Sequence, residues 1–100
     1  MNYFEIPLEP KAQTFRVTIL SVTYQFTLQW RLTAWYLDIV SDVGEKLLSG
    51  VPLLTGSNLL SQYRYLGFDF ALFVLASGSD DSDPTYESLG STHRLYFATS

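Results

Sequence analysis

A run of strict two-residue alternation constrains this chain most. From Val22 to Leu32 every even position is apolar and every odd position is polar. The preceding segment, TFRVTI at residues 14–19, alternates in the same way. A period of two is typical of a β-strand with one buried face and one face in water. The two segments therefore predict a hairpin.

Matching the two faces predicts the register of this hairpin. Folding the chain about residues 20 and 21 pairs apolar with apolar and polar with polar side chains: Ile19 with Val22, Val17 with Tyr24, Phe15 with Phe26, Thr18 with Thr23, and Arg16 with Gln25. A slip of one residue would turn every apolar side chain to the wrong face. Leu20 and Ser21 suit a two-residue primed turn poorly, because such turns need positive φ. We therefore expect a four-residue loop, 19–22, in the same register.

The remaining segments predict further short strands. A second hairpin is expected from Ala34 to Leu54, with its turn at SDVGE and either Leu47 or Leu48 facing inward. Pro52 cannot donate to a ladder, which places it at a strand end or a sheet edge. Residues 68–76 are apolar on both faces and predict a central strand. Residues 93–98 predict the last strand, and residues 3–6, followed by a proline, predict an edge strand.

These segments define the expected fold class. We expect an all-β domain over residues 1–100, a small antiparallel β-barrel or sandwich of five to seven strands. Leucine and tyrosine at helical spacing predict one short helix around residues 57–66, capped by Ser57 or Asn58.

The glycines before that helix loosely resemble a phosphate-binding loop. Gly50 and Gly56 bracket five residues, and Ser57 follows. A Walker loop has four residues between its glycines and a lysine after them. Because the spacing differs and the lysine is missing, the segment predicts a strand-to-helix corner and no nucleotide site.

The inventory of reactive side chains argues against an enzyme. The chain has no cysteine and a single histidine, His93, which is expected at the surface or as a cap at the start of a strand. An acidic loop contains Asp80, Asp81, Asp83 and Glu87. Its spacing has some likeness to a calcium loop, but Pro84 interrupts it and the sixth position lacks glycine. We predict no catalytic, cofactor or metal site, and a loop that faces solvent or a partner.

The charge and hydropathy of the chain limit the classes of partner that it can bind. A net charge of −4 argues against binding to nucleic acid, which needs clustered basic side chains. The longest apolar run, residues 70–76, is far shorter than the roughly 20 residues of a membrane span, and no signal peptide is evident. We expect a soluble chain.

Apolar residues make up 47% of the chain and charged residues only 16%. A small core cannot hide so many apolar side chains, which favours exposed patches that bind other proteins. Tyrosine can bury area and keep its hydroxyl wet, so Tyr63, Tyr65 and Tyr86, with Arg64, are candidate interface residues.

Four segments carry a family resemblance: WYLDIV from Trp35, GVPLLTGSNLL from Gly50, YESLG from Tyr86 and RLYF from Arg94. In this order they resemble the small baseplate plug-like structural proteins of contractile-tailed phages, typified by a cyanophage baseplate plug. The resemblance spans nearly the whole chain, and GVPLLTGSNLL is its most specific part.

The resemblance implies a non-enzymatic virion protein, assembled in the host cytoplasm and located at the centre of the tail baseplate as a plug or tube-end adaptor. The implied partners are tube, hub or spike proteins and copies of the chain in a three- or six-fold ring. No catalytic residue or cofactor belongs to that role. The alternative from the residues alone is a small β-barrel that binds a ligand or peptide, which predicts a monomer with an accessible apolar pocket.

Overall fold

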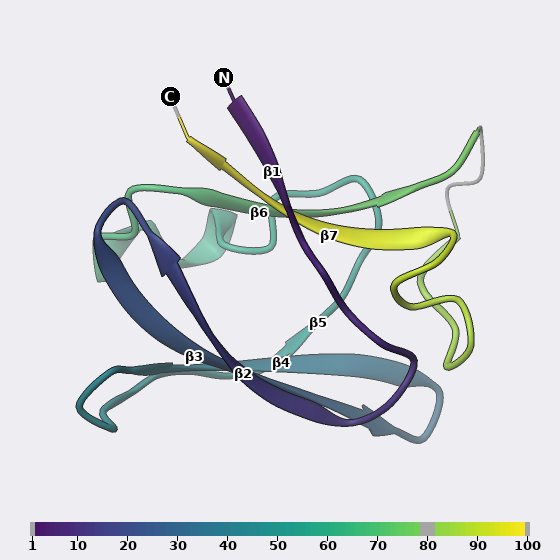
Figure 1. Cartoon of the computed structure of the whole chain (residues 1–100), viewed down its shortest axis with the longest axis horizontal. Helices are drawn as coiled ribbons and strands as arrows, with labels where there is room; N and C mark the ends of the chain where they lie inside the picture. Colours follow the sequence, from purple (N-terminus) through teal and green to yellow (C-terminus); the bar gives the residue numbers. More distant parts are fainter. Residues whose placement is uncertain (1, 79–81, 100) are drawn as a thin grey trace.

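The computed structural model describes residues 2–78 and 82–99, with the backbone alone at residues 64 and 65. Within these residues the chain forms seven strands and one short 3₁₀ helix (Figure 1): β1 Asn2–Ile6, β2 Gln13–Ile19, β3 Val22–Arg31, β4 Ala34–Ser41, β5 Lys46–Pro52, η1 Ser61–Leu66, β6 Ala71–Ala76 and β7 His93–Thr99. The predicted all-β class is confirmed.

Two antiparallel sheets pack with the core between them. One has the order β1-β7-β6 and the other β2-β3-β4-β5. In Figure 1 the three-stranded sheet lies above the four-stranded one, and the long β3 bends up toward it at the left. The two sheets do not join into a closed barrel, so of the two predicted architectures the chain adopts the sandwich.

The core comes from the inner faces of both sheets. Fully buried side chains on the four-stranded sheet include Phe26, Leu28 and Trp35, and on the other sheet Leu72 and Leu95. Fully burying an aliphatic or phenyl side chain contributes about 1.5–3 kcal/mol. The alternation in residues 22–32 therefore marks the inner face correctly from Tyr24 to Trp30, whereas Val22 is 49% exposed and Leu32, beyond the end of β3, is 95% exposed.

The β2–β3 hairpin has the predicted register but a different turn. All five predicted pairs occur, from Phe15 opposite Phe26 to Ile19 opposite Val22. The predicted four-residue loop is wrong, because Leu20 and Ser21 form a two-residue turn with φ of 52° and 70°. A primed turn matches the right-handed twist of paired strands, and here that match outweighs a left-handed backbone cost of about 1–2 kcal/mol per residue.

Replacing Leu20 and Ser21 together by Asn and Gly should stabilise the chain. Asparagine and glycine accept positive φ, and Leu20 is 54% exposed, so little burial is lost. We expect the free energy of unfolding, measured by urea denaturation, to rise by about 1–2 kcal/mol. Unchanged or lower stability would show that the turn is not strained.

The second hairpin resolves which leucine faces inward. Ile39 lies opposite Leu48, which is buried, while Leu47 is only partly buried. Register shifts on either side of Ile39 mark bulges, which regular alternation could not predict. Pro52 is the last residue of β5 at the sheet edge, as expected.

The corner after β5 contains less helix than predicted. In place of a helix at 57–66 the chain has a 3₁₀ helix at 61–66, kinked at Tyr63. Asn58 Oδ1 accepts hydrogen bonds from the backbone N–H of Leu60 at 3.0 Å and of Leu72 at 3.2 Å. The Asn58 side chain therefore caps the turn and also ties it to β6, a tertiary contact that helix spacing cannot reveal.

The prediction that residues 68–76 form a central strand is wrong. The centre of the three-stranded sheet is β7, and β6 lies at its edge. Segment 55–59 covers that edge, with the Gly56 N–H donating to the Val74 carbonyl at 2.9 Å and the Leu59 N–H to the Leu72 carbonyl at 2.8 Å. Segment 55–59 therefore occupies the outer edge of β6, and Gly56, with a φ of 85°, lets the chain turn there.

Tyr24 gives the fold an alkaline dependence. Its half-buried ring contacts Phe68 and Phe70 at centroid separations of 6.1 and 5.4 Å. Burial, with a smaller effect from the negative charge of Asp69, raises the pKa of the Tyr24 hydroxyl above its ordinary value. The folded state therefore keeps this hydroxyl neutral to a higher pH than the unfolded chain does.

We expect this difference to appear in stability measured against pH. The contribution of Tyr24 is complete below about pH 10, the ordinary tyrosine pKa, and is lost as pH rises through the raised folded-state value. Tyr24→Phe should make the alkaline fall in unfolding free energy shallower, as measured by urea denaturation at a series of pH values. Parallel curves for the two proteins would contradict the assignment.

Candidate partner-binding surface

On β2 and β3 the outer face of the four-stranded sheet is polar, whereas β4 adds Ala34, Tyr36 and Val40 to it. Its β2 and β3 positions carry Thr14, Arg16, Thr18, Thr23, Gln25, Thr27, Gln29 and Arg31. The hydroxyls of Thr18 and Thr23 lie 2.9 Å apart, and those of Thr14 and Thr27 lie 3.2 Å apart. This hydroxyl-rich surface is the solvent-facing side that the alternation predicts.

The outer face of the three-stranded sheet is different. The side chains that point away from the core are, apart from two charged residues at one side, Tyr3 on β1, Ala71, Phe73 and Leu75 on β6, and Tyr96 and Ala98 on β7. We call this set the aromatic outer face. Tyr3 is 50% exposed and Leu75 is 40% exposed. The rings of Tyr3 and Phe73 lie 5.8 Å apart, across the middle strand.

The two charges on this sheet face cancel. The Arg94 guanidinium lies 3.5 Å from the Glu5 carboxylate, and both side chains are partly exposed. In a chain of net charge −4, the aromatic outer face is therefore a neutral, apolar surface. Contiguous apolar surface rimmed by polar groups is typical of protein-binding sites.

Loop 82–92 is tied to the rest of the chain by polar contacts. The Thr55 N–H donates to Asp83 Oδ1 at 3.0 Å, and the Thr55 hydroxyl donates to the Ser82 carbonyl at 2.7 Å. His93 Nε2 lies 2.9 Å from the same Ser82 carbonyl. His93 starts β7 as predicted, but it is only 3% exposed, so its predicted surface position is wrong. The loop folds over the imidazole, and local sequence does not encode that contact.

An aromatic cluster fixes the other part of this loop. Trp35 Nε1–H donates to the Thr85 carbonyl at 3.0 Å. The Tyr86 ring stacks on Trp35 at 5.4 Å and 16°, and meets Trp30 edge-on at 5.6 Å and 85°. Tyr86 remains 44% exposed, so it can contact a partner and still pack on the core.

The structure does not bring the candidate interface residues together. Tyr63, in the kink of η1, is half-buried against the core. Arg64 and Tyr65 share that helix, whereas Tyr86 lies in loop 82–92. In Figure 1 the helix is at the left of the molecule and this loop is at the right. The four residues therefore do not form a single patch.

The acidic loop is only partly described. Asp80 and Asp81 lie outside the described residues. Asp83 accepts the Thr55 N–H, and Glu87 is exposed. Residues 2–78 and 82–99 contain no group of three side chains arranged to hold a metal ion.

Sequence reasoning missed the aromatic outer face. The available signal is the apolar character of both faces of residues 71–76, which also predicts a central strand. A strand with two apolar faces also fits an outer face that awaits a partner. Knowledge of the strand order is needed to choose between these explanations.

The fold defines a small all-β protein with one apolar outer face. The chain belongs to the family described as cyanophage baseplate Pam3 plug gp18, which matches residues 3–100. No curated protein matches it. Membership confirms the predicted resemblance and makes the chain a structural component of the phage tail baseplate, located in the virion, with other baseplate and tail proteins as partners. In the described part of the chain, no helix is both long enough and apolar enough to cross a bilayer.

Proposed function

We propose that the chain is a non-enzymatic plug or tube-end adaptor at the centre of the baseplate, near the junction of tail tube and hub. Residues 1–100 act as one β domain, and copies stand in a three- or six-fold ring. The aromatic outer face carries this proposal, because it is neutral and apolar while β2 and β3 on the opposite face of the sandwich carry polar side chains. The aromatic outer face packs on a neighbouring protein, and the polar face turns to water.

Binding to the neighbouring protein would be stabilised by the burial of apolar side chains, with no chemical reaction. Tyr3 and Leu75 are each about half exposed, so covering them contributes on the order of 1 kcal/mol each. Repetition around a ring multiplies this gain. Tyr63, Arg64, Tyr65 and Tyr86 act as secondary contacts at two ends of the molecule, and the acidic loop (Asp80, Asp81, Asp83 and Glu87) faces solvent or a partner.

A pair of aspartate substitutions tests the proposal. Leu75→Asp places a charge on the aromatic outer face, and Gln29→Asp adds the same charge to the polar outer face. We expect Leu75→Asp to lower the amount of chain in purified tail particles by about tenfold or more, because covering the new carboxylate strips it of water, a cost that its cross-strand neighbour Arg94, already paired with Glu5, does not offset. Gln29→Asp should be incorporated like the wild type.

The measurement is quantitative mass spectrometry of the particles. Circular dichroism of each isolated variant confirms that it is folded. Tyr3→Asp serves as a second variant of the same face if Leu75→Asp does not fold. Equal incorporation of folded variants from both faces would overturn the proposed role of the aromatic outer face.

A further inference from the structure

The edges of the two sheets are not equally protected. Segment 55–59 covers β6, β1 is short and is followed by Pro7, and β5 carries bulges and ends at Pro52. Such features keep sheet edges from pairing with other chains. The edge strand β2, Gln13–Ile19, has no proline, glycine or bulge. No other strand in the described part of the chain pairs with its outer side.

The hairpin turn determines which backbone groups this edge offers. Ile19 and Val22 flank a two-residue turn and form a hydrogen-bonded pair, and such pairs alternate with non-bonded ones. The N–H and C=O groups of Thr14, Arg16 and Thr18 therefore point away from β3. Close contact of side chains is typical of non-bonded pairs, and the hydroxyl contacts of Thr14 and Thr18 fit this phase.

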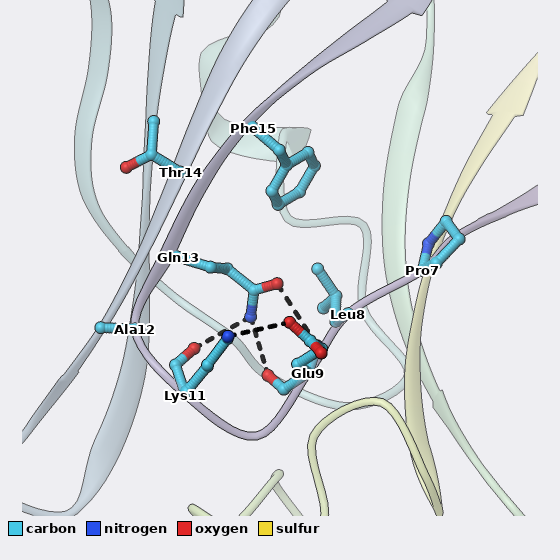
Figure 2. A pocket seen from close by; sticks show the side chains of 8 residues that line it. All are labelled: Pro7, Leu8, Glu9, Lys11, Ala12, Gln13, Thr14 and Phe15. Carbon is cyan, nitrogen blue, oxygen red and sulfur yellow. Dashed lines mark hydrogen bonds and ion pairs between the residues drawn. The ribbon is translucent and has the colours of Figure 1, made fainter.

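A hollow lies beside the first half of this edge. It has a volume of about 550 Å³ and lies between the start of β2 and the connector from β1. Figure 2 shows Phe15 on β2 above, Leu8 and Pro7 on the connector to the right, and the Gln13 amide below Phe15. Gln13 Nε2 donates to the backbone carbonyls of Glu9 at 2.7 Å and Lys11 at 2.9 Å. These bonds hold the connector in place, so the hollow is formed before a partner arrives.

We propose that β2 and this hollow form a docking groove for one extended strand of a neighbouring baseplate protein. The strand adds to the sheet through the backbone groups of Thr14, Arg16 and Thr18. Addition of a strand draws affinity from the backbone and specificity from pockets for alternate side chains. This inference rests on the proposed function and names the means by which one partner is held.

The chemistry of the groove specifies the partner. On the inner face, Phe15 and Val17 are half-buried and would be covered by apolar side chains of the added strand, one of which enters the hollow. On the outer face, Arg16 is exposed and has no ion pair among the described residues. The partner strand therefore alternates apolar with polar residues and carries a carboxylate beside Arg16.

The position of Arg16 also disfavours a second copy of β2 as the occupant. Arg16 is the middle residue of the strand, so two fully overlapping β2 strands paired about a two-fold axis would set their guanidinium groups directly opposite each other. Like charges that face each other across strands are destabilising. An acidic strand from a different protein has no such conflict.

Amide hydrogen exchange tests the groove directly. The amides of Thr14, Arg16 and Thr18 should exchange at least about tenfold more slowly in assembled tail particles than in the isolated chain. The amides of Phe15 and Val17, bonded to β3, should be protected in both and provide the control within the same strand. Unchanged exchange of the three outward amides in the particle would overturn the inference.

Hydrogen exchange combined with cryo-EM of the same particles, which locates the chain, separates the two proposals. If the chain is at the baseplate centre but its outward amides still exchange fast, the docking groove is contradicted and the proposed function stands. If the chain lies elsewhere in the particle, the proposed function is contradicted. Protection that already appears in the isolated chain and grows with its concentration would identify a second copy as the occupant and contradict the inference.

Charge reversal provides an independent test. Arg16→Glu and Arg31→Glu make the same change in net charge on the same polar face, but only Arg16 lies on the edge strand. We expect Arg16→Glu to reduce incorporation into particles by about tenfold, and Arg31→Glu to leave it near the wild-type level. Equal incorporation of the two variants would overturn the assigned role of Arg16.

Discussion

Replacing Gly90 with alanine is expected to destabilise the chain by about 3 kcal/mol or more. Gly90 has a φ of +85°, and a β-carbon there would collide with the backbone carbonyl of Leu8. Its own N–H donates to the His93 carbonyl at 2.7 Å, so the glycine cannot easily move away. The added methyl group must displace loop 82–92 from the β1–β2 connector.

Gly44→Ala is the matched control for this prediction. Gly44 has a φ of +90°, and open space surrounds the position of its missing β-carbon. This variant has the same backbone strain without the collision, so it should cost only about 1 kcal/mol. Urea denaturation measures both. Equal losses would show that the loop and the connector are not in contact as described.

Trp35→Ala should have an effect of similar size, about 3–5 kcal/mol. Trp35 is completely buried, supports the Tyr86 ring, and bonds the Thr85 carbonyl through its indole nitrogen. Truncation leaves a cavity in the core and also removes the anchor of loop 82–92. We expect a large fall in the urea midpoint and faster proteolysis within the loop.

Trp35→Phe separates the two contributions. Phenylalanine keeps most of the ring packing but cannot donate to the Thr85 carbonyl, so it should cost about 1–3 kcal/mol. The Trp35→Ala protein should be the less stable of the two by a clear margin. If both variants lose the same stability, the hydrogen bond dominates and the cavity argument is wrong.

The β2–β3 hairpin was predictable because its two faces agree in only one register. Its turn was not, since the conformation of Leu20 and Ser21 follows from the twist of the paired strands and not from their own preferences. The second hairpin was located correctly, but the register shifts on either side of Ile39 interrupt regular alternation and could not be predicted from it.

The errors elsewhere share a physical cause. The burial of His93, the edge position of β6 and the double role of Asn58 all come from contacts between segments far apart in the sequence. The surface predictions suffered in the same way. Local composition predicts tyrosines near charged residues as interface residues. The aromatic outer face forms only because β1, β7 and β6 lie side by side, which local composition does not show.

Cryo-EM of the assembled tail tests the central claim most directly. We expect the two-sheet fold at the centre of the baseplate, repeated in a three- or six-fold ring near the junction of tube and hub. A neighbouring protein should cover Tyr3, Phe73 and Leu75. A reconstruction that places the chain at the baseplate rim, or that leaves these three side chains in solvent, would contradict the account.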